Sequence, residues 1–107
     1  MGFFGEMSKR LNLPIANIDF RVPAEAPYGA YVIEQENYIT ADSKVVYSEK
    51  EIAFYLYHTK NDKVTEAMTD SYFYSKNMMF EKENNWIKEE ELIETVYLLQ
   101  FNKTEEL

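Results

Sequence analysis

The chain contains no cysteine, so it can form neither a disulfide framework nor a thiolate metal site. Its three glycines, Gly2, Gly5 and Gly29, are too few and too scattered to build a phosphate-holding loop. The one histidine, His58, would have no second imidazole to share a transition metal with. We therefore expect no cofactor and no metal site.

Basic residues are also scarce, with eleven Lys and Arg against nineteen Asp and Glu and a net charge of −8. This balance repels phosphate backbones and anionic lipid. No run of apolar residues approaches the roughly 20 that a membrane-spanning helix needs. The first ten residues also lack the apolar segment of a secretion signal. We therefore expect no sequence-specific nucleic-acid binding and no membrane binding.

No group of residues is suited to catalysis. Paired carboxylates could support hydrolysis, but nothing in the sequence sets one of the candidates apart from its neighbours: Glu81, Glu83, Glu89, Glu90 and Glu91. His58 falls at the end of a predicted strand, where a structural role is the simpler interpretation. We expect the protein not to be an enzyme and to have no catalytic residues.

The 107 residues correspond to a single domain, residues 1–107. The spacing of Phe4, Met7 and Leu11 predicts a short helix within residues 1–12. Alternation and turn residues predict strands at 28–35, 44–47, 51–59, 78–82 and 92–101, with a strand or linker at 15–20 and a charged, flexible tail at 102–107. In the strand 51–59, Ile52, Phe54 and Leu56 share one face, which His58 continues.

One main helix is predicted to follow Asn61 and Asp62, which are good N-terminal caps, and to run to about residue 74. Its expected apolar stripe is Val64, Ala67, Met68, Ser71 and Tyr72, with Met68 facing Phe54 and Leu56. Short turns between neighbouring strands favour antiparallel pairing. The predicted fold is α+β: an antiparallel or mixed sheet of four to five strands, with the main helix on one face and a short N-terminal helix.

Residues 36–50 join the two best strands and are too many for a tight turn, so we predict a protruding loop. The segment has more apolar residues than a solvated loop needs, and these are the candidate subunit or partner interface: Tyr38, Ile39, Val45, Val46 and Tyr47. Three acids, Glu36, Asp42 and Glu49, are candidates to face a DNA channel. The alternative is a plain β-hairpin extension with no partner.

Four short segments, taken together, resemble a known family. They are Pro27-Tyr28-Gly29-Ala30-Tyr31-Val32, Ala41-Asp42-Ser43-Lys44-Val45-Val46-Tyr47, Tyr57-His58-Thr59-Lys60 and Ile93-Glu94-Thr95-Val96-Tyr97. Their order resembles small head-to-tail joining or tail-completion proteins of long-tailed bacteriophages, which include tail terminators. The resemblance covers about residues 13–101. The chain departs from the pattern at Gly29, Ala30, Ser43 and His58.

The resemblance implies a structural virion protein, made in the cytoplasm of the bacterial host and placed where tail meets head. Such proteins form homo-oligomeric rings, commonly hexamers, which contact the tail-tube protein and the head connector while DNA passes through the middle. An acidic chain fits a channel that DNA slides through. The alternative function is a small acidic phage inhibitor or DNA mimic that acts by binding another protein.

Overall fold

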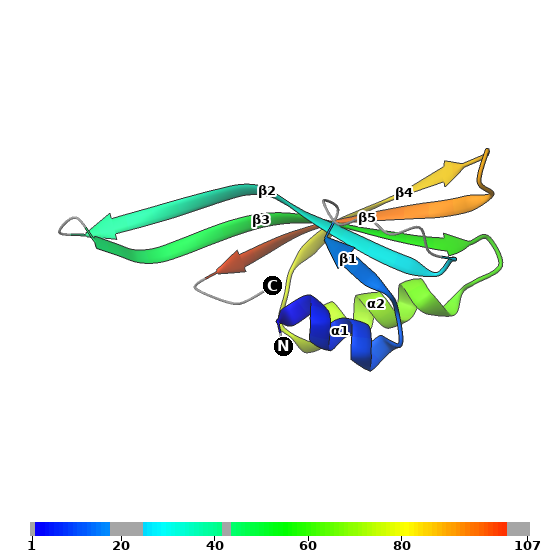
Figure 1. The fold of residues 1–107 in the computed structure, drawn as a ribbon, viewed down its shortest axis with the longest axis horizontal. Coiled ribbons are helices and arrows are strands. Elements are labelled where there is room, and N and C mark those ends of the chain that lie inside the picture. Colours follow the sequence, from blue (N-terminus) through cyan, green and yellow to red (C-terminus); the bar gives the residue numbers. More distant parts are fainter. Residues whose placement is uncertain (1, 18–24, 42–43, 103–107) are drawn as a thin grey trace.

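The structure is a computed structural model that describes residues 2–17, 25–41 and 44–102. For residues 37–41, 44–48 and 102 it gives the backbone alone. Two helices and five strands follow one another along the chain (Figure 1): α1 (Phe3–Leu11), β1 (Ile15–Asn17), β2 (Tyr28–Ala41), β3 (Lys44–Thr59), α2 (Val64–Ser75), β4 (Phe80–Ile87) and β5 (Leu92–Asn102).

The strands form one mixed sheet in the order β1-β2-β3-β5-β4. β1 runs parallel to β2, and every other neighbouring pair is antiparallel. Both helices lie on the same side of this sheet (Figure 1). The predicted α+β fold, with a main helix and a short N-terminal helix, is confirmed.

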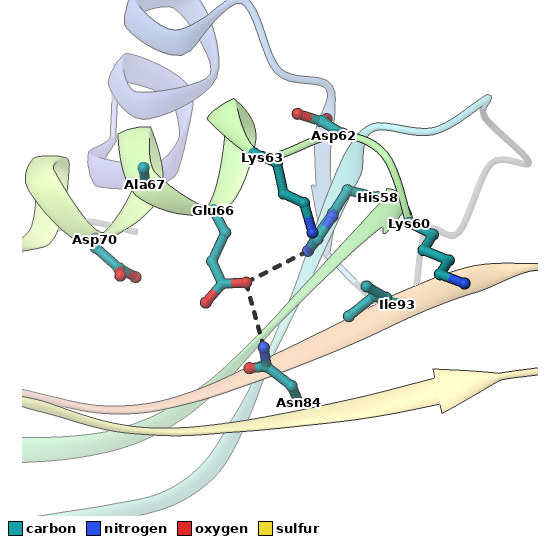
Figure 2. A pocket seen from close by; sticks show the side chains of 9 residues that line it. All are labelled: His58, Lys60, Asp62, Lys63, Glu66, Ala67, Asp70, Asn84 and Ile93. Carbon is teal, nitrogen blue, oxygen red and sulfur yellow. Dashed lines mark hydrogen bonds and ion pairs between the residues drawn. The ribbon is translucent and has the colours of Figure 1, made fainter.

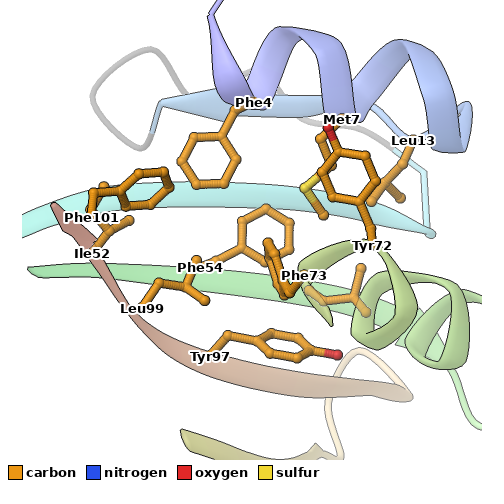
Figure 3. Packing of buried hydrophobic residues seen from close by; sticks show 11 residues of the cluster. Phe4, Met7, Leu13, Ile52, Phe54, Tyr72, Phe73, Tyr97, Leu99 and Phe101 are labelled. Carbon is orange, nitrogen blue, oxygen red and sulfur yellow. The ribbon is translucent and has the colours of Figure 1, made fainter. Parts of the chain in front are cut away.

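The core fills the space between the sheet and the two helices (Figure 3). Phe54 at the centre of β3 is 0% exposed, and its ring lies 5.5 Å from that of Phe4 and 5.8 Å from that of Phe73. The remaining members are mostly aromatic or large aliphatic side chains: Met7, Leu13, Ile52, Leu56, Tyr72, Tyr97, Leu99 and Phe101. The predicted shared face of Ile52, Phe54, Leu56 and His58 is therefore confirmed.

Gly29 lies beneath this core, where β2 passes the ring of Phe54. A Cβ atom added at Gly29 would lie 2.6 Å from Cζ of Phe54, closer than two carbon atoms can approach. The absence of a side chain at Gly29 thus leaves room for the ring of Phe54.

The predicted apolar stripe of α2 is correct for Tyr72, which is buried, and wrong for the other four residues, which are exposed: Val64, Ala67, Met68 and Ser71. Val64 is 62% exposed and Met68 is 37% exposed, whereas Thr69, Tyr72 and Phe73 are the buried residues of the helix. Phe54 accordingly packs against Phe73 and not against Met68. The helix carries apolar side chains on more than one side, so spacing alone could not identify the face that the sheet covers.

Two strand predictions also need correction. The segments 44–47 and 51–59 are one continuous strand, β3, because the polar residues between them, 48–50, do not break a strand exposed to water. β4 extends to Ile87, beyond the predicted end at residue 82. β5 ends at Asn102, so the rest of the predicted tail lies outside the described residues.

The face of the sheet opposite the helices is called the open face, because neither helix covers it (Figure 1). Strand register and alternation place residues from three adjacent strands in its centre. They are Tyr28, Ala30 and Val32 of β2, Ala53, Tyr55 and Tyr57 of β3, and Val96 and Leu98 of β5.

Candidate functional site: a protruding arm

β2 and β3 continue well beyond the rest of the sheet as a two-stranded ribbon (Figure 1). We call residues 38–41 and 44–48 the arm. Its register pairs are Tyr38 with Ser48, Ile39 with Tyr47, Thr40 with Val45 and Ala41 with Lys44. The predicted protruding loop is therefore wrong for the backbone, which forms the β-hairpin extension of the alternative.

The arm has no strand beside it among the described residues. β1 ends at Asn17 opposite Tyr31, and β5 ends at Asn102 opposite Glu49. Beyond these points, within the described ranges, the two strands of the arm pair with each other and with no third strand. The molecule is consequently elongated, with extents of 53 × 26 × 24 Å.

Two irregularities change the direction of the ribbon. The register shifts between Ile33 and Gln35, and again between Ile39 and Thr40. Each shift adds one unpaired residue, Glu34 in the first case and Val46 in the second. Bulges of this kind bend a strand pair and increase its twist, and Figure 1 shows the ribbon curving as it leaves the sheet.

All five candidate interface residues lie in the arm. Tyr38 and Ile39 belong to β2, and Val45, Val46 and Tyr47 belong to β3. The pairing of Ile39 with Tyr47 and of Thr40 with Val45 brings the two halves of this group together across the ribbon. The hairpin therefore brings the candidate residues of β2 next to those of β3.

The candidate channel-facing acids are placed differently from one another. Glu36 is the register partner of Lys50, and its carboxylate lies 3.9 Å from the Lys50 ammonium. Glu49 adjoins Lys50 in β3, so alternation places it on the opposite face of the ribbon from Glu36. Asp42 lies outside the described residues.

A polar pocket of about 330 Å³ lies where the end of β3 meets the start of α2 (Figure 2). Residues of β3, α2, β4, β5 and the β3–α2 connection line it: His58, Lys60, Asp62, Lys63, Glu66, Ala67, Asp70, Asn84 and Ile93. The volume would admit a small ligand, which makes the pocket a second candidate site.

The polar side chains around this pocket mainly satisfy one another. Nδ1 of His58 donates to the carbonyl oxygen of Thr59 at 3.0 Å, and Nε2 lies 3.6 Å from Oε1 of Glu66. The Lys82 ammonium donates to Glu66 at 2.7 Å and to Asp70 at 2.8 Å. No buried polar side-chain atom within the described part of the chain lacks a partner.

Tyr97 anchors the other end of this network. Its hydroxyl donates to Oδ1 of Asp70 at 2.6 Å, and burial together with this hydrogen bond raises the pKa of Tyr97 well above its usual range. Burial opposes protonation of Lys82, but its hydrogen bonds to Asp70 and Glu66 raise its pKa overall. A neutral tyrosine and a cationic lysine can hold α2 on the sheet, but they offer no nucleophile or base.

The sequence did not indicate this network, because its members come from β3, α2, β4 and β5. The one available signal was the spacing of Glu66 and Asp70, which places two carboxylates on the same side of a helix. Among the residues that the structure describes, no three His, Cys, Asp or Glu side chains are grouped to hold a metal ion.

No helix within the described ranges is long and apolar enough to cross a membrane. No protein-family model matches the chain, and no curated protein matches it. Of the two candidate sites, the arm has the geometry of a binding element, since it extends from the sheet without a third strand among the described residues.

Proposed function

We propose that this chain is a non-catalytic structural subunit that completes a phage tail and joins it to the head connector. The arm is the observation that carries this proposal. Under this proposal, the arm of each subunit contacts a neighbouring subunit or the tail tube. The repeated contacts build a homo-oligomeric ring through which DNA passes. The resemblance of residues 13–101 to tail-completion proteins supports the choice of this assembly.

The arm supports a binding role because a two-stranded hairpin is at best marginally stable in water. The four outermost register pairs receive no backbone support from a third strand among the described residues. Both edges of the ribbon consequently present backbone groups that another chain can pair with. Contact with a partner would stabilise it, as strand addition does in other complexes.

A ring also needs a particular kind of contact. When each subunit uses one surface to bind a different surface of the next, the contact is heterologous, and it closes into a ring if the rotation permits. An arm that extends away from its own sheet suits such a contact, because it can reach a neighbouring subunit without direct contact between the two cores.

The proposal can be tested by shortening the arm. Asn37 and Glu49 are register partners, so residues 38–48 can be replaced with Asn-Gly, which closes a hairpin in a two-residue turn. The shortened chain should fold, because the described residues that are removed, 38–41 and 44–48, pair in register with one another and not with the core strands. In the phage that encodes the chain, it should be missing from purified tails, and heads should fail to attach.

Electron microscopy of tails provides the readout. Tails with the full-length chain should carry extra density at the head-proximal end, and tails with the shortened chain should not. A folded shortened chain that gives normal phage yield would overturn the role of the arm. Tails that never contain the full-length chain would overturn the proposed function altogether.

The acids of the open face favour a second candidate function, a small acidic inhibitor that occupies the basic site of another protein. Glu81 and Glu83 lie on this face at adjacent outward positions of β4. An inhibitor would need no arm and would be absent from virions. Full biological activity of the shortened chain, with no chain in the virion, would support this candidate.

A further inference from the structure

The open face is a large sheet surface with an apolar centre. Leu98 is 41% exposed, and Tyr55, Tyr57, Val32 and Val96 are each half-buried. The rings of Tyr28 and Tyr57 stack across β2 and β3, with centroids 4.9 Å apart. Exposed apolar patches of this kind, with polar residues around them, mark interaction sites.

The charges around this centre all have one sign. Register places Glu51 of β3, Glu81 and Glu83 of β4 and Glu94 of β5 on the open face, and the bulged Glu34 lies close enough to influence Tyr55. Lys50 of β3 and Lys82 of β4 lie on the opposite face of the sheet, which the helices cover. Among the described strand residues from Tyr28 to Gln35 and from Glu51 onward, register and alternation place no Lys or Arg on this face.

Two tyrosines of the open face lie close to these glutamates, and their pKa values are raised. Burial, followed by the charges of Glu34 and Glu94, raises the pKa of Tyr55. The Tyr57 hydroxyl donates to Oε2 of Glu94 at 2.8 Å, and burial and this bond raise the pKa of Tyr57 above its usual range. Both hydroxyls therefore remain neutral donors within an acidic surround.

This charge pattern decides among possible occupants. A second copy placed face to face would oppose two sets of glutamates, which costs free energy at every close pair. Nucleic acid and anionic lipid carry the same sign as the face and are repelled by it. A protein surface with an apolar centre and surrounding Lys and Arg side chains would complement both the apolar centre and the glutamates of the open face.

We infer that the open face is a docking surface for such a basic protein surface. This interaction adds to the proposed function, since a subunit that joins two structures needs a second contact, but it does not involve the arm. Apolar contact supplies most of the affinity, and the glutamates select the partner and accelerate its approach.

A charge-reversed copy of the chain is a suitable probe, because it offers the same apolar centre with the opposite charge. The probe carries Glu51→Lys, Glu81→Lys and Glu83→Lys, three exposed positions outside the core. Mixed with the wild-type chain at low ionic strength, it should form a heterodimer in sedimentation velocity. Sheets can pack face to face in this way at about 10 Å separation.

The matched control carries Glu89→Lys, Glu90→Lys and Glu91→Lys, which change the net charge equally at the β4–β5 turn. The probe should bind the wild-type chain at least about tenfold more tightly than the control does, and salt at about 1 M should weaken the complex. Amide NMR shifts should map to the outward residues of β3 and β5. Leu98→Asp in the wild-type chain should abolish binding, because it places a charge in the apolar centre.

Three results would overturn the inference. The first is the absence of a heterodimer between folded partners. The second is equal binding of the probe and the control. The third is self-association of the wild-type chain that Leu98→Asp removes, which would make a second copy the occupant. The arm-shortened chain should still bind the probe, so failure of the arm proposal is distinguishable from failure of this one.

Discussion

Phe54 lies at the centre of the aromatic core, with the rings of Phe4, Phe73 and Tyr97 around it. Phe54→Ala should lower the free energy of unfolding by about 3–5 kcal/mol, because it removes a buried ring and leaves a cavity. Urea denaturation followed by tryptophan fluorescence measures this change. Met79 is 89% exposed, so Met79→Ala should cost less than about 0.5 kcal/mol. A loss below about 1 kcal/mol for Phe54→Ala would contradict the placement of β3.

Asp62 holds the start of α2 by accepting hydrogen bonds from the backbone N–H groups of Val64 and Thr65, each at 3.1 Å. Burial acts to raise its pKa, but hydrogen bonds from Thr65 and Val64 lower it overall below the ordinary 3.8. A lowered folded-state pKa means that the stabilisation is fully present above pH 3.8. It is lost as pH falls through the folded-state pKa.

The variant Asp62→Asn distinguishes the contribution of the carboxylate charge from that of the hydrogen bonds to the start of α2. The asparagine keeps an acceptor for the helix but does not titrate, so the variant should be slightly less stable at neutral pH and should lose less stability on acidification. Asp62→Ala should cost about 0.5–2 kcal/mol at neutral pH. Urea titrations at a series of pH values provide the measurement, and parallel curves for wild type and Asp62→Asn would refute the assignment.

At the scale of elements, the arm and the core should differ in local stability. The arm has two strands and no third partner among the described residues, whereas Phe54 of β3 has a strand on each side. We expect amides of residues 38–48 to exchange with solvent at low opening free energy, and those of residues 52–56 to exchange only on global unfolding. Hydrogen exchange followed by NMR tests this. Equal protection in both segments of the free chain would mean that the arm is already supported.

The elements also show how far the sequence can predict this fold. Alternation identified the inward face of β3 correctly, because Ile52, Phe54 and Leu56 are apolar and lie on a strand with a strong period of two. Helical spacing failed to identify the buried face of α2, where Val64 and Met68 are apolar but exposed. For the arm, the sequence predicts a strand at 44–47 and otherwise a protruding loop, because the segment is too long for a tight turn, whereas its backbone is the β-hairpin extension of the alternative.

The sites were less predictable than the elements. Tyr97 and Asp70 meet only because β5 lies beneath α2, and no local pattern contains that long-range contact. The acidic character of the open face depends on strand register, since a shift of one residue would move Glu81 and Glu83 to the side of the helices. Composition revealed the excess of acid, and only the three-dimensional arrangement showed where it is concentrated.

At the scale of the whole molecule, the arm determines the dimensions. The Cα radius of gyration is 15.0 Å, whereas a compact chain of this length has about 13 Å. Small-angle X-ray scattering of the monomer should give a radius that falls by about 2 Å when residues 38–48 are replaced with Asn-Gly. An unchanged radius would mean that the arm folds back onto the core in solution.

The separation of arm and core has a consequence for how such a protein can evolve. Mutations at residues 38–48 should leave the buried cluster around Phe54 intact, so selection for a new partner can act on them without a penalty in folding. Core positions such as Gly29 have no such freedom. Lineages could therefore diverge rapidly in their arms while keeping one scaffold, and an arm grafted from a relative should transfer its partner preference to this core.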